Sequence, residues 1–343
     1  MPDFTAVIAK TSVGQTLSVD EAEHAFDILM RGEADIAQMA SFLTALRVRG
    51  ETVPEIVGGA KAMRARAELI NAPSNALDIV GTGGSGLDTY NVSTAAAFVA
   101  SAAGIQVAKH GNRAASSKSG SADVLEALGA NLDISFAHVQ KALDTTGFTF
   151  LFARAHHKAM RHVAPVRSSL KFKTIFNLLG PLSSPAQAKN QLLGVFDRDW
   201  VRPIAEVLKE LGSNHAMVVH GSDGMDEITL SGPTFVAELK NGKIKEYELS
   251  PADLGLPQTP LADLLGGDTA YNANAILNLF DGAQSPFRDI VLANAGAGLM
   301  IGGKANSLID GIAIAATLID DGSAKSAMSK WINFTNSEET ENA

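Results

Sequence analysis

Apolar positions in the first part of the chain recur at the spacing of α-helices. Ser18-Val-Asp-Glu21 has the pattern of a capping box, and apolar residues follow at Ala22, Ala25, Phe26 and Leu29. A similar pattern over 36–46 predicts a second helix that ends at Gly50, and Pro54 marks the start of a third. Three short helices cannot form a large core alone, so we expect them to pack on one another and on a partner.

Beyond a turn-rich stretch at 71–75, the pattern changes to strands that alternate with helices. Short apolar runs predict strands at 78–80, 105–108, 148–152, 191–196 and 216–220, and helices are expected at 91–103, 121–128 and 201–211. This alternation predicts right-handed crossovers and a mostly parallel sheet. Asn241-Gly242 predicts a hairpin between 234–239 and 243–249, and 276–331 has the periodicity of three or four helices.

Composition and charge narrow the classes of function. The 343 residues include no cysteine, which excludes disulfides, zinc–thiolate sites, iron–sulfur clusters and cysteine nucleophiles. No apolar run reaches the roughly 18 residues of a membrane span, and the first residues lack the pattern of a secretory signal. The net charge of −9 argues against general nucleic-acid binding but allows an anion in a local basic pocket. We therefore expect a cytoplasmic α/β enzyme with no membrane or nucleic-acid partner.

A glycine loop, Gly81-Thr-Gly-Gly-Ser-Gly86, joins a predicted strand to a predicted helix. Glycines let the backbone approach a ligand, and N–H groups of the loop and of the helix N-terminus favour an anion. The spacing matches neither the dinucleotide fingerprint nor a P-loop. In Asn91-Val-Ser-Thr94 the hydroxyls can cap the helix, bind phosphate or bind Mg²⁺. The alternative for the glycine loop is a tight turn without a ligand.

A second polar loop, Lys109-His-Gly-Asn-Arg-Ala-Ala-Ser-Ser117, follows the next predicted strand. Its two cations, amide and hydroxyls suit a polyanion. Because the carboxyl ends of neighbouring parallel strands bring their loops together, both loops are expected to converge on one ligand, a diphosphate. The alternative is a solvated surface loop.

Adjacent carboxylates, Asp226 and Glu227, follow a later strand, with Asp223 nearby. Hard oxygen ligands of this kind suit Mg²⁺ held between the protein and a diphosphate. The alternative is an acidic surface turn.

Basic and imidazole side chains cluster after the strand at 148–152. Arg167 follows Pro165 and could bind a carboxylate through two hydrogen bonds; the alternative is a surface ion pair. His156, His157 and His162 lack the spacing of a metal site, and we expect them to pack or to border the substrate.

Four long segments in this order resemble the anthranilate phosphoribosyltransferase family: GTGGSGLDTYNVSTAAAFVASAAG, KHGNRAASSKSGSADVLEALG, APVRSSLKFKTIFNLLGPLSSPA and HGSDGMDEITL. The resemblance covers nearly the whole chain. It implies a small N-terminal helical domain and a larger α/β domain with a mostly parallel central sheet flanked by helices. The implied helical domain is 1–72, with 174–190 returning to it. The implied α/β domain is 73–173 and 191–333, followed by a frayed tail at 334–343, and the helical domains are expected to form a homodimer.

The resemblance also implies a reaction, a cofactor and site residues. The phosphoribosyl group of 5-phosphoribosyl 1-diphosphate (PRPP) passes to the amine of anthranilate, with Mg²⁺ as cofactor. The implied PRPP site comprises Gly81, Gly84, Ser85, Thr89, Asn91, Val92, Ser93, Thr94, Lys109, His110, Gly111, Asn112, Arg113, Ala114, Ala115, Ser116, Ser117 and Ser121. Gly81, Asn112 and Arg167 mark the anthranilate site, and Ser93, Asp226 and Glu227 the metal site. The implied catalytic residues are Lys109, Asn112 and Arg167.

This chain departs from the family pattern at a few positions. Ser85 replaces an aspartate, which removes a carboxylate beside the metal–diphosphate site; Lys171 replaces a glycine, Tyr271 an acidic residue and Arg154 a proline. One alternative is a pyrimidine nucleoside phosphorylase with the same architecture. Another is a non-enzymatic relative that binds nucleic acid, for which a basic cleft and loss of Arg167 would be expected. A dehydrogenase is disfavoured because the dinucleotide spacing is absent.

Overall fold

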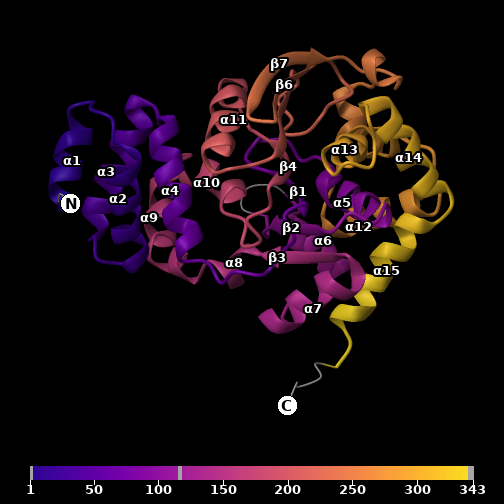
Figure 1. The fold of residues 1–343 in the computed structure, drawn as a ribbon, viewed down its shortest axis with the longest axis horizontal. Helices are drawn as coiled ribbons and strands as arrows, with labels where there is room; N and C mark the ends of the chain where they lie inside the picture. The colour runs from indigo at the N-terminus through magenta and orange to yellow at the C-terminus, as the bar shows by residue number, and fades with distance from the viewer. Residues whose placement is uncertain (1–2, 115–117, 339–343) are drawn as a thin grey trace.

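A computed structural model describes residues 3–114 and 118–338 and contains an N-terminal helical domain beside a larger α/β domain (Figure 1). The helical domain begins with α1 (Phe4–Ser12), α2 (Val19–Arg31), α3 (Ile36–Arg49) and α4 (Val53–Ala65). The predicted capping box of α2 is present, and Gly50 ends α3 with a φ of 91°. Helix α1 was not predicted, because it buries only Phe4, Val7 and Thr11 and so shows a weak periodicity.

The α/β domain is built on a seven-stranded sheet in the order β3-β2-β1-β4-β5-β6-β7. Five strands are parallel: β1 (Leu77–Gly81), β2 (Val107–Gly111), β3 (Phe148–Phe152), β4 (Asn190–Gly194) and β5 (His215–Gly221). The edge hairpin, β6 (Thr234–Lys240) and β7 (Lys243–Leu249), is antiparallel. Its turn has positive φ at both Asn241 and Gly242, as predicted for this residue pair. The mostly parallel sheet is thus confirmed.

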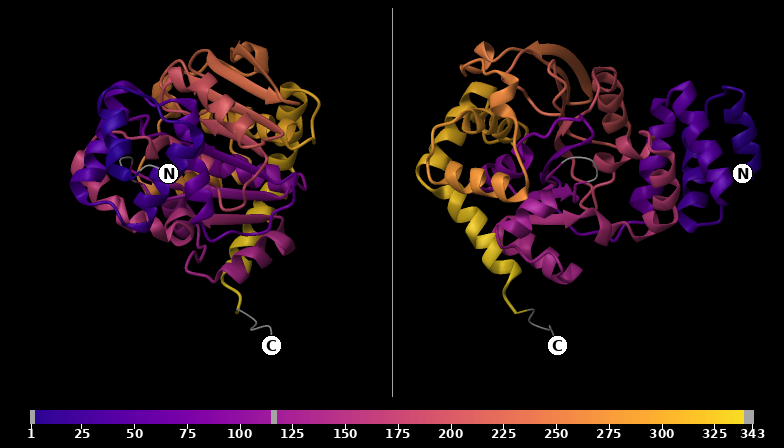
Figure 2. Two further views of the ribbon diagram at one scale, coloured as in Figure 1. Left: turned by 60° about the vertical axis from the view of Figure 1, so that its left-hand side comes forward. Right: turned by 180° about the vertical axis from the view of Figure 1, so that it is seen from behind.

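Helices cover both faces of the sheet (Figures 1 and 2). Crossover helices are α5 (Val92–Ala102), α6 (Ser121–Ala127), α7 (Phe136–Thr146) and α11 (Val201–Glu210). The predicted C-terminal helices are four: α12 (Thr269–Phe280), α13 (Pro286–Ile301), α14 (Leu308–Asp320) and α15 (Ser323–Thr335). Among the described residues, no helix combines the length and the apolar character that a membrane crossing requires.

The predicted position of the second strand was wrong, and this error affects the site. It was expected at 105–108 with a polar loop from Lys109, but β2 runs from Val107 to Gly111. Lys109 and His110 therefore lie within the sheet, paired in register with Phe150 and Leu151. Their polarity indicated a loop, yet both are buried, at 1% and 4% exposure. The helix α7 was also not predicted.

Short helices connect the two domains after β3. These are α8 (Ala153–His156), α9 (Ala164–Leu170) and α10 (Phe176–Leu182). The ring of Phe176 packs against that of Phe26 with centroids 5.7 Å apart, and Arg64 Nε donates to the Leu182 carbonyl at 2.8 Å. The chain thus returns to the helical domain side through α10. Lys171, at the end of α9, has a φ of 56°, the left-handed region that the glycine expected there would adopt more easily.

Candidate active site

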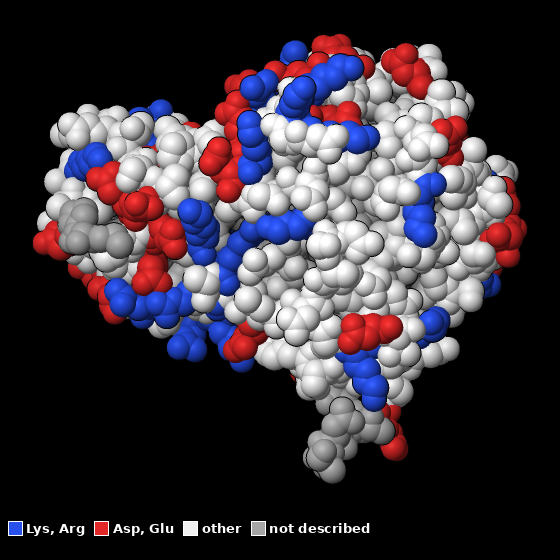
Figure 3. Space-filling view, viewed as in Figure 1, with Lys and Arg blue, Asp and Glu red and all other residues white. Residues whose placement is uncertain are grey.

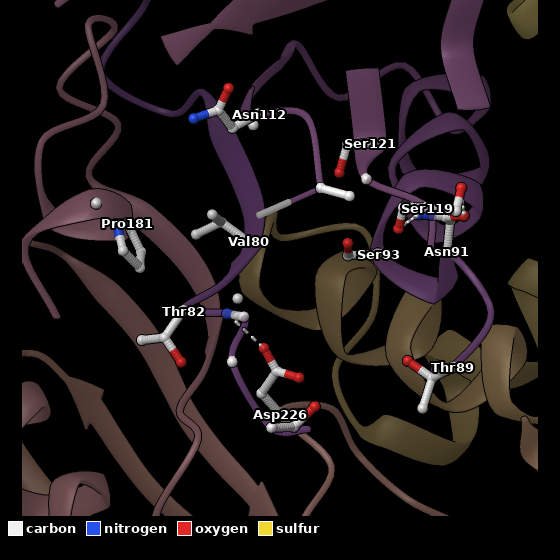
Figure 4. Close-up of a pocket in the computed structure, with 18 of the residues that line it drawn as sticks. Val80, Thr82, Thr89, Asn91, Ser93, Asn112, Ser119, Ser121, Pro181 and Asp226 are labelled. Atoms are coloured by element: carbon white, nitrogen blue, oxygen red, sulfur yellow. Dashed lines mark hydrogen bonds between the residues drawn. The ribbon is translucent and has the colours of Figure 1, made fainter. Parts of the chain in front are cut away.

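A cleft of about 380 Å³ lies at the carboxyl ends of β1 and β2. Its walls come from the glycine loop, the start of α5, the loop after β2, α10, and Asp226 with Glu227 (Figure 4). Lys and Arg side chains gather where the helical lobe meets the larger body, although the chain is acidic as a whole (Figure 3). The cleft is at the edge of the sheet where parallel α/β folds bind their ligands.

Most residues implied by the family resemblance line this one cleft. They are Gly81, Gly84, Ser85, Thr89, Asn91, Val92, Ser93, Lys109, His110, Gly111, Asn112, Arg113, Ala114, Ser121, Arg167, Asp226 and Glu227. Thr94 does not line it: this side chain is fully buried, and its hydroxyl has no hydrogen-bond partner among the described residues. Ala115, Ser116 and Ser117 lie outside the described residues.

The glycine loop is held against the acidic pair. Gly83, Gly84 and Gly86 all have positive φ, so this backbone path favours glycine. The Gly83 N–H donates to Asp226 Oδ2 at 2.8 Å (Figure 4), and a Cβ at Gly81 would lie 2.5 Å from the same oxygen. The backbone of the glycine loop is therefore in close contact with the Asp226 carboxylate, and this contact constrains the loop.

The start of α5 faces the cleft without a side-chain cap. Asn91 occupies the N-cap position but makes no capping hydrogen bond. The Ser93 hydroxyl, one residue into the helix, accepts from Lys109 Nζ at 3.2 Å. First-turn N–H groups have no acceptor within their own helix, and they favour an anion at this end.

Lys109 is a buried cation behind the glycine loop. Its Nζ donates to the Ile79 carbonyl at 2.6 Å and to Ser93 Oγ. Burial lowers the pKa of this ammonium group, and the negative charges of Asp78 and Glu227 oppose that shift. The lysine is thus fixed in one position at the floor of the cleft.

Asp226 and Glu227 form a carboxylate pair whose charge is poorly stabilised by the protein alone. Burial, and then repulsion from Asp226, raises the pKa of Glu227 to about 8, although Lys109 opposes the shift. Burial also raises the pKa of Asp226. Two adjacent hard oxygen donors with raised pKa values fit a divalent cation. No cluster of three or more His, Cys, Asp or Glu in the described ranges could complete such a site, so substrate or water oxygens would be needed.

Asp223 does not belong to this pair. It accepts hydrogen bonds from the hydroxyls of Thr229 and Ser231 and from the Met225 N–H. It therefore shapes the turn that carries Asp226 and Glu227.

Arg167, on α9, also lines the cleft. It is half-buried, and its guanidinium lies 5.4 Å from the ring centre of Phe176. No ion pair within residues 3–114 and 118–338 includes Arg167, so the alternative of a surface ion pair is wrong. An unpaired guanidinium at a cleft wall is suited to a carboxylate ligand.

Arg113 lies at the edge of the cleft and is already engaged. It pairs with Glu126 and Asp123 of α6 and stacks on Phe152. Asp123 in turn accepts from the N–H groups of Ala114 and Gly120, both at 2.9 Å. These contacts join the two ends of the second loop. The side chain of Arg113 is therefore engaged in stabilising this loop.

Two of the histidines after β3, His156 and His157, pack in the interior, whereas His162 is only partly buried. His157 is buried with its ring 5.4 Å from that of His110, and His156 Nδ1 lies 2.6 Å from the Glu68 carbonyl. Burial lowers the pKa of His157 to about 4 and lowers the pKa of His110. They are neutral packing groups at the junction of the two domains.

Several lining residues were not found from the sequence. They are Val80, Thr82, Tyr90, Ser119, Phe176, Asn177, Gly180 and Pro181. The α10 group carried a usable signal, because an asparagine, a glycine and a proline inside a seven-residue helix are unusual. The sequence around Ser119 gave no such signal, because Ser119 and Asn91 come into contact only in the folded chain.

The architecture and the cleft define a two-domain glycosyl transferase. Residues 73–325 match the glycosyl transferase family a/b domain, and residues 5–67 match the glycosyl transferase family helical bundle domain. These two matches cover most of the chain, and they divide it between the same helical and α/β regions that the structure contains.

Full-length relatives identify the particular family. The anthranilate phosphoribosyltransferase of Parvibaculum lavamentivorans is 56% identical over 98% of this chain and 98% of its own length. That of Rhodopseudomonas palustris (strain BisB5) is 53% identical over 98% of this chain and 99% of its own. The chain belongs to the anthranilate phosphoribosyltransferase family. These relatives do not favour the nucleoside phosphorylase or the nucleic-acid-binding alternative.

Solved structures agree with this assignment. The anthranilate phosphoribosyltransferase of Thermus thermophilus superposes with a TM-score of 0.92 at 44% identity, covering 96% of this chain and 99% of that one. The Saccharomyces cerevisiae enzyme, solved in complex with PRPP and Mg, has a TM-score of 0.90 at 28% identity, covering 98% of both chains.

Proposed function

We propose that this protein transfers the phosphoribosyl group of PRPP to the amine of anthranilate, giving N-(5-phosphoribosyl)anthranilate and diphosphate. The main support for this proposal is that four groups suited to the two substrates line one cleft. An N–H-rich glycine loop, a fixed cation at Lys109 and the Asp226–Glu227 pair face an unpaired guanidinium at Arg167. The first three suit a metal-bound diphosphate, and the last suits the carboxylate of anthranilate.

The leaving diphosphate is the group that the cleft is built to stabilise. Backbone N–H groups of the glycine loop donate to its oxygens, the N-terminus of α5 favours the anion, and Lys109 supplies fixed positive charge. Mg²⁺, held by Asp226, Glu227 and Ser93 when bound, adds positive charge that makes diphosphate a better leaving group. Because Lys109 is already held by Ile79 and Ser93, no reorganisation is needed when charge develops.

Anthranilate is placed by the other wall. Arg167 binds its carboxylate, and Asn112 and Gly81, which line the same cleft, border the ring and the amine. The arylamine is a neutral nucleophile and attacks C1 of the ribose as the bond to diphosphate breaks; the amine proton leaves to solvent or to a released diphosphate oxygen. Catalysis then consists of positioning and charge stabilisation, without a covalent intermediate.

A direct assay tests the proposed reaction. Purified protein is mixed with anthranilate, PRPP and Mg²⁺, and the loss of anthranilate fluorescence is followed. We expect a loss that requires all three components. An unchanged signal, in a sample that still binds PRPP, would show that the acceptor is another molecule and would reopen the assignment of Arg167.

We also propose that the enzyme is a homodimer in the cytoplasm, assembled through the helical domain. Large apolar side chains are exposed there, with Val48 82%, Val13 71% and Ile36 69% exposed. Exposed large apolar side chains are available for contact with a second chain. Light scattering of the purified protein should give twice the mass of one chain, and Val48→Asp should shift it toward the mass of a monomer. A wild-type monomer would refute the assembly.

A further inference from the structure

The residues just before α12 contact the segment that follows the glycine loop. Thr89 forms an isolated antiparallel bridge with Leu265, and the Gly266 N–H donates to the Asp88 carbonyl at 2.8 Å. A Cβ at Gly266 would lie 2.7 Å from the Thr89 carbonyl oxygen, so this approach requires glycine. Two parts of the chain more than 170 residues apart are thus locked together beside the cleft.

The side chain of Asn272, in the first turn of α12, forms hydrogen bonds across this contact. It is 1% exposed, and its Nδ2 donates to Asn91 Oδ1 at 2.9 Å and to the Thr89 carbonyl at 3.4 Å. Its Oδ1 accepts from the Gly267 N–H at 2.9 Å. An N–H can only donate, so the Gly267 contact fixes which end of the amide faces which way. The Asn272 nitrogen must therefore face Asn91.

This contact determines the orientation of the Asn91 amide. Asn91 Oδ1 accepts from Asn272 Nδ2 and from Ser119 Oγ, the latter at 3.2 Å, and Asn91 Nδ2 lies 3.4 Å from the Ser119 carbonyl (Figure 4). Both donors thus lie on the oxygen side. The amide nitrogen carries two hydrogens, and one is left for a ligand in the cleft that Asn91 lines.

We propose that Asn272 is a positioning residue that holds the Asn91 amide with its nitrogen, and not its oxygen, toward the diphosphate of PRPP. This inference rests on the proposed function. Asn272 does not line the cleft, so it acts through Asn91. The reverse orientation of Asn91 would place carbonyl lone pairs against an anion, which weakens binding.

Three variants separate this role from a structural one. Asn272→Asp keeps an acceptor for Gly267 but sets a carboxylate against Asn91 Oδ1, which favours the reversed amide. Asn272→Ala removes the constraint without favouring reversal. Asn274→Asp, at an exposed position two residues further along α12, makes the same chemical change and adds the same charge.

PRPP binding is measured by calorimetry with Mg²⁺ at pH 9, so that a carboxyl group is ionised even where burial raises its pKa. We expect Asn272→Asp to weaken binding at least tenfold, Asn272→Ala to weaken it less, and Asn274→Asp to change it less than twofold. A simple packing defect would give the opposite order for the first two, since alanine leaves the larger cavity.

A double-variant cycle supplies the decisive comparison. With Asn91→Ala as background, Asn272→Asp should change the PRPP dissociation constant by less than twofold. An equal loss with and without the Asn91 side chain, or an equal loss in Asn274→Asp, would overturn the proposal. Because binding is measured without turnover, a wild-type protein that binds PRPP but leaves anthranilate unchanged would refute the proposed reaction alone.

Discussion

At the scale of single residues, the site depends on charges that are held where water cannot easily reach them. Lys109 is 1% exposed and is bonded to a carbonyl and a hydroxyl. Desolvation makes each such group costly to bury, but a charge in this position acts strongly on a ligand in the cleft. The positive charge of Lys109 stabilises the negative charge of Glu227, whereas Asp226 and Glu227 repel each other. A metal ion bound with diphosphate would reduce this repulsion.

Lys109→Met should lower kcat by at least about 100-fold, because it removes a fixed cation near the leaving group while it preserves side-chain volume. Steady-state kinetics provide the measurement, and thermal unfolding provides the control for folding. If kcat stayed within threefold of the wild type in a folded variant, Lys109 would have no electrostatic role in the reaction.

Arg167→Ala should raise the KM for anthranilate at least tenfold, about 1.4 kcal/mol, while the KM for PRPP changes less than twofold. The reason is that Arg167 lines the cleft and its guanidinium has no ion-pair partner in the part of the chain that the structure describes. Arg161→Ala, at an exposed arginine six residues earlier, is the matched control and should change neither constant. Equal loss of affinity for both substrates would contradict the assignment.

At the scale of secondary-structure elements, strand ends bring the loops together by close backbone contact. Gly194, at the end of β4, is the clearest example, since a Cβ there would lie 1.7 Å from the Asp226 carbonyl oxygen. The turn that carries the carboxylate pair is thus placed by β4, although Gly194 itself is outside the cleft. The position of that turn depends on a residue that no functional motif marks.

Gly194→Ala should therefore displace Asp226 and raise the Mg²⁺ concentration needed for half-maximal rate at least fivefold, with a loss of stability of about 1–3 kcal/mol. Gly302→Ala is the control: its Cβ would meet the Ile105 side chain at 2.4 Å, in the packing around α13. It should destabilise the protein without changing the Mg²⁺ requirement. The same Mg²⁺ dependence in both variants would rule out the role given to β4.

The histidines between β3 and α10 predict a dependence of stability on pH. His157 is neutral in the folded protein because burial lowers its pKa from 6.5 to about 4. Between pH 6.5 and 4 the unfolded chain binds a proton at His157 that the folded one does not, so the contribution of His157 to stability falls as pH falls and is constant above this range.

His157→Phe should remove part of this dependence. The free energy of unfolding, measured with urea at pH 7.5 and at pH 5, should fall by about 2 kcal/mol less in the variant than in the wild type. An identical decrease in both proteins would show that His157 does not contribute.

The sequence predicted elements well where local signals were strong. The run at 148–152 became β3 with the same bounds, and Asn241-Gly242 formed the expected turn. The second strand was misplaced because Lys109 and His110 are polar residues that tertiary contacts bury. The nine-residue α1 and the helix α7 were missed, since a short element takes most of its stability from packing that the sequence does not display.

At the scale of the whole molecule, the site is assembled from distant segments. Gly81 touches Asp226, Asn91 is held by Asn272, and Arg167 lines the same cleft from α9. The motifs indicated what each segment binds, and the rule for parallel sheets indicated that the first two loops meet. The Asn272 contact and the α10 wall could not be found from the sequence, because they depend on how α12 and the domain connection are placed in space.

One cleft, we infer, joins an activated phosphoribosyl group to anthranilate. The most direct test is mass spectrometry of the products after incubation with PRPP, anthranilate and Mg²⁺, together with a measurement of released diphosphate. We expect N-(5-phosphoribosyl)anthranilate and diphosphate in equal amounts. Ribose 5-phosphate and diphosphate, with anthranilate unconsumed, would contradict it.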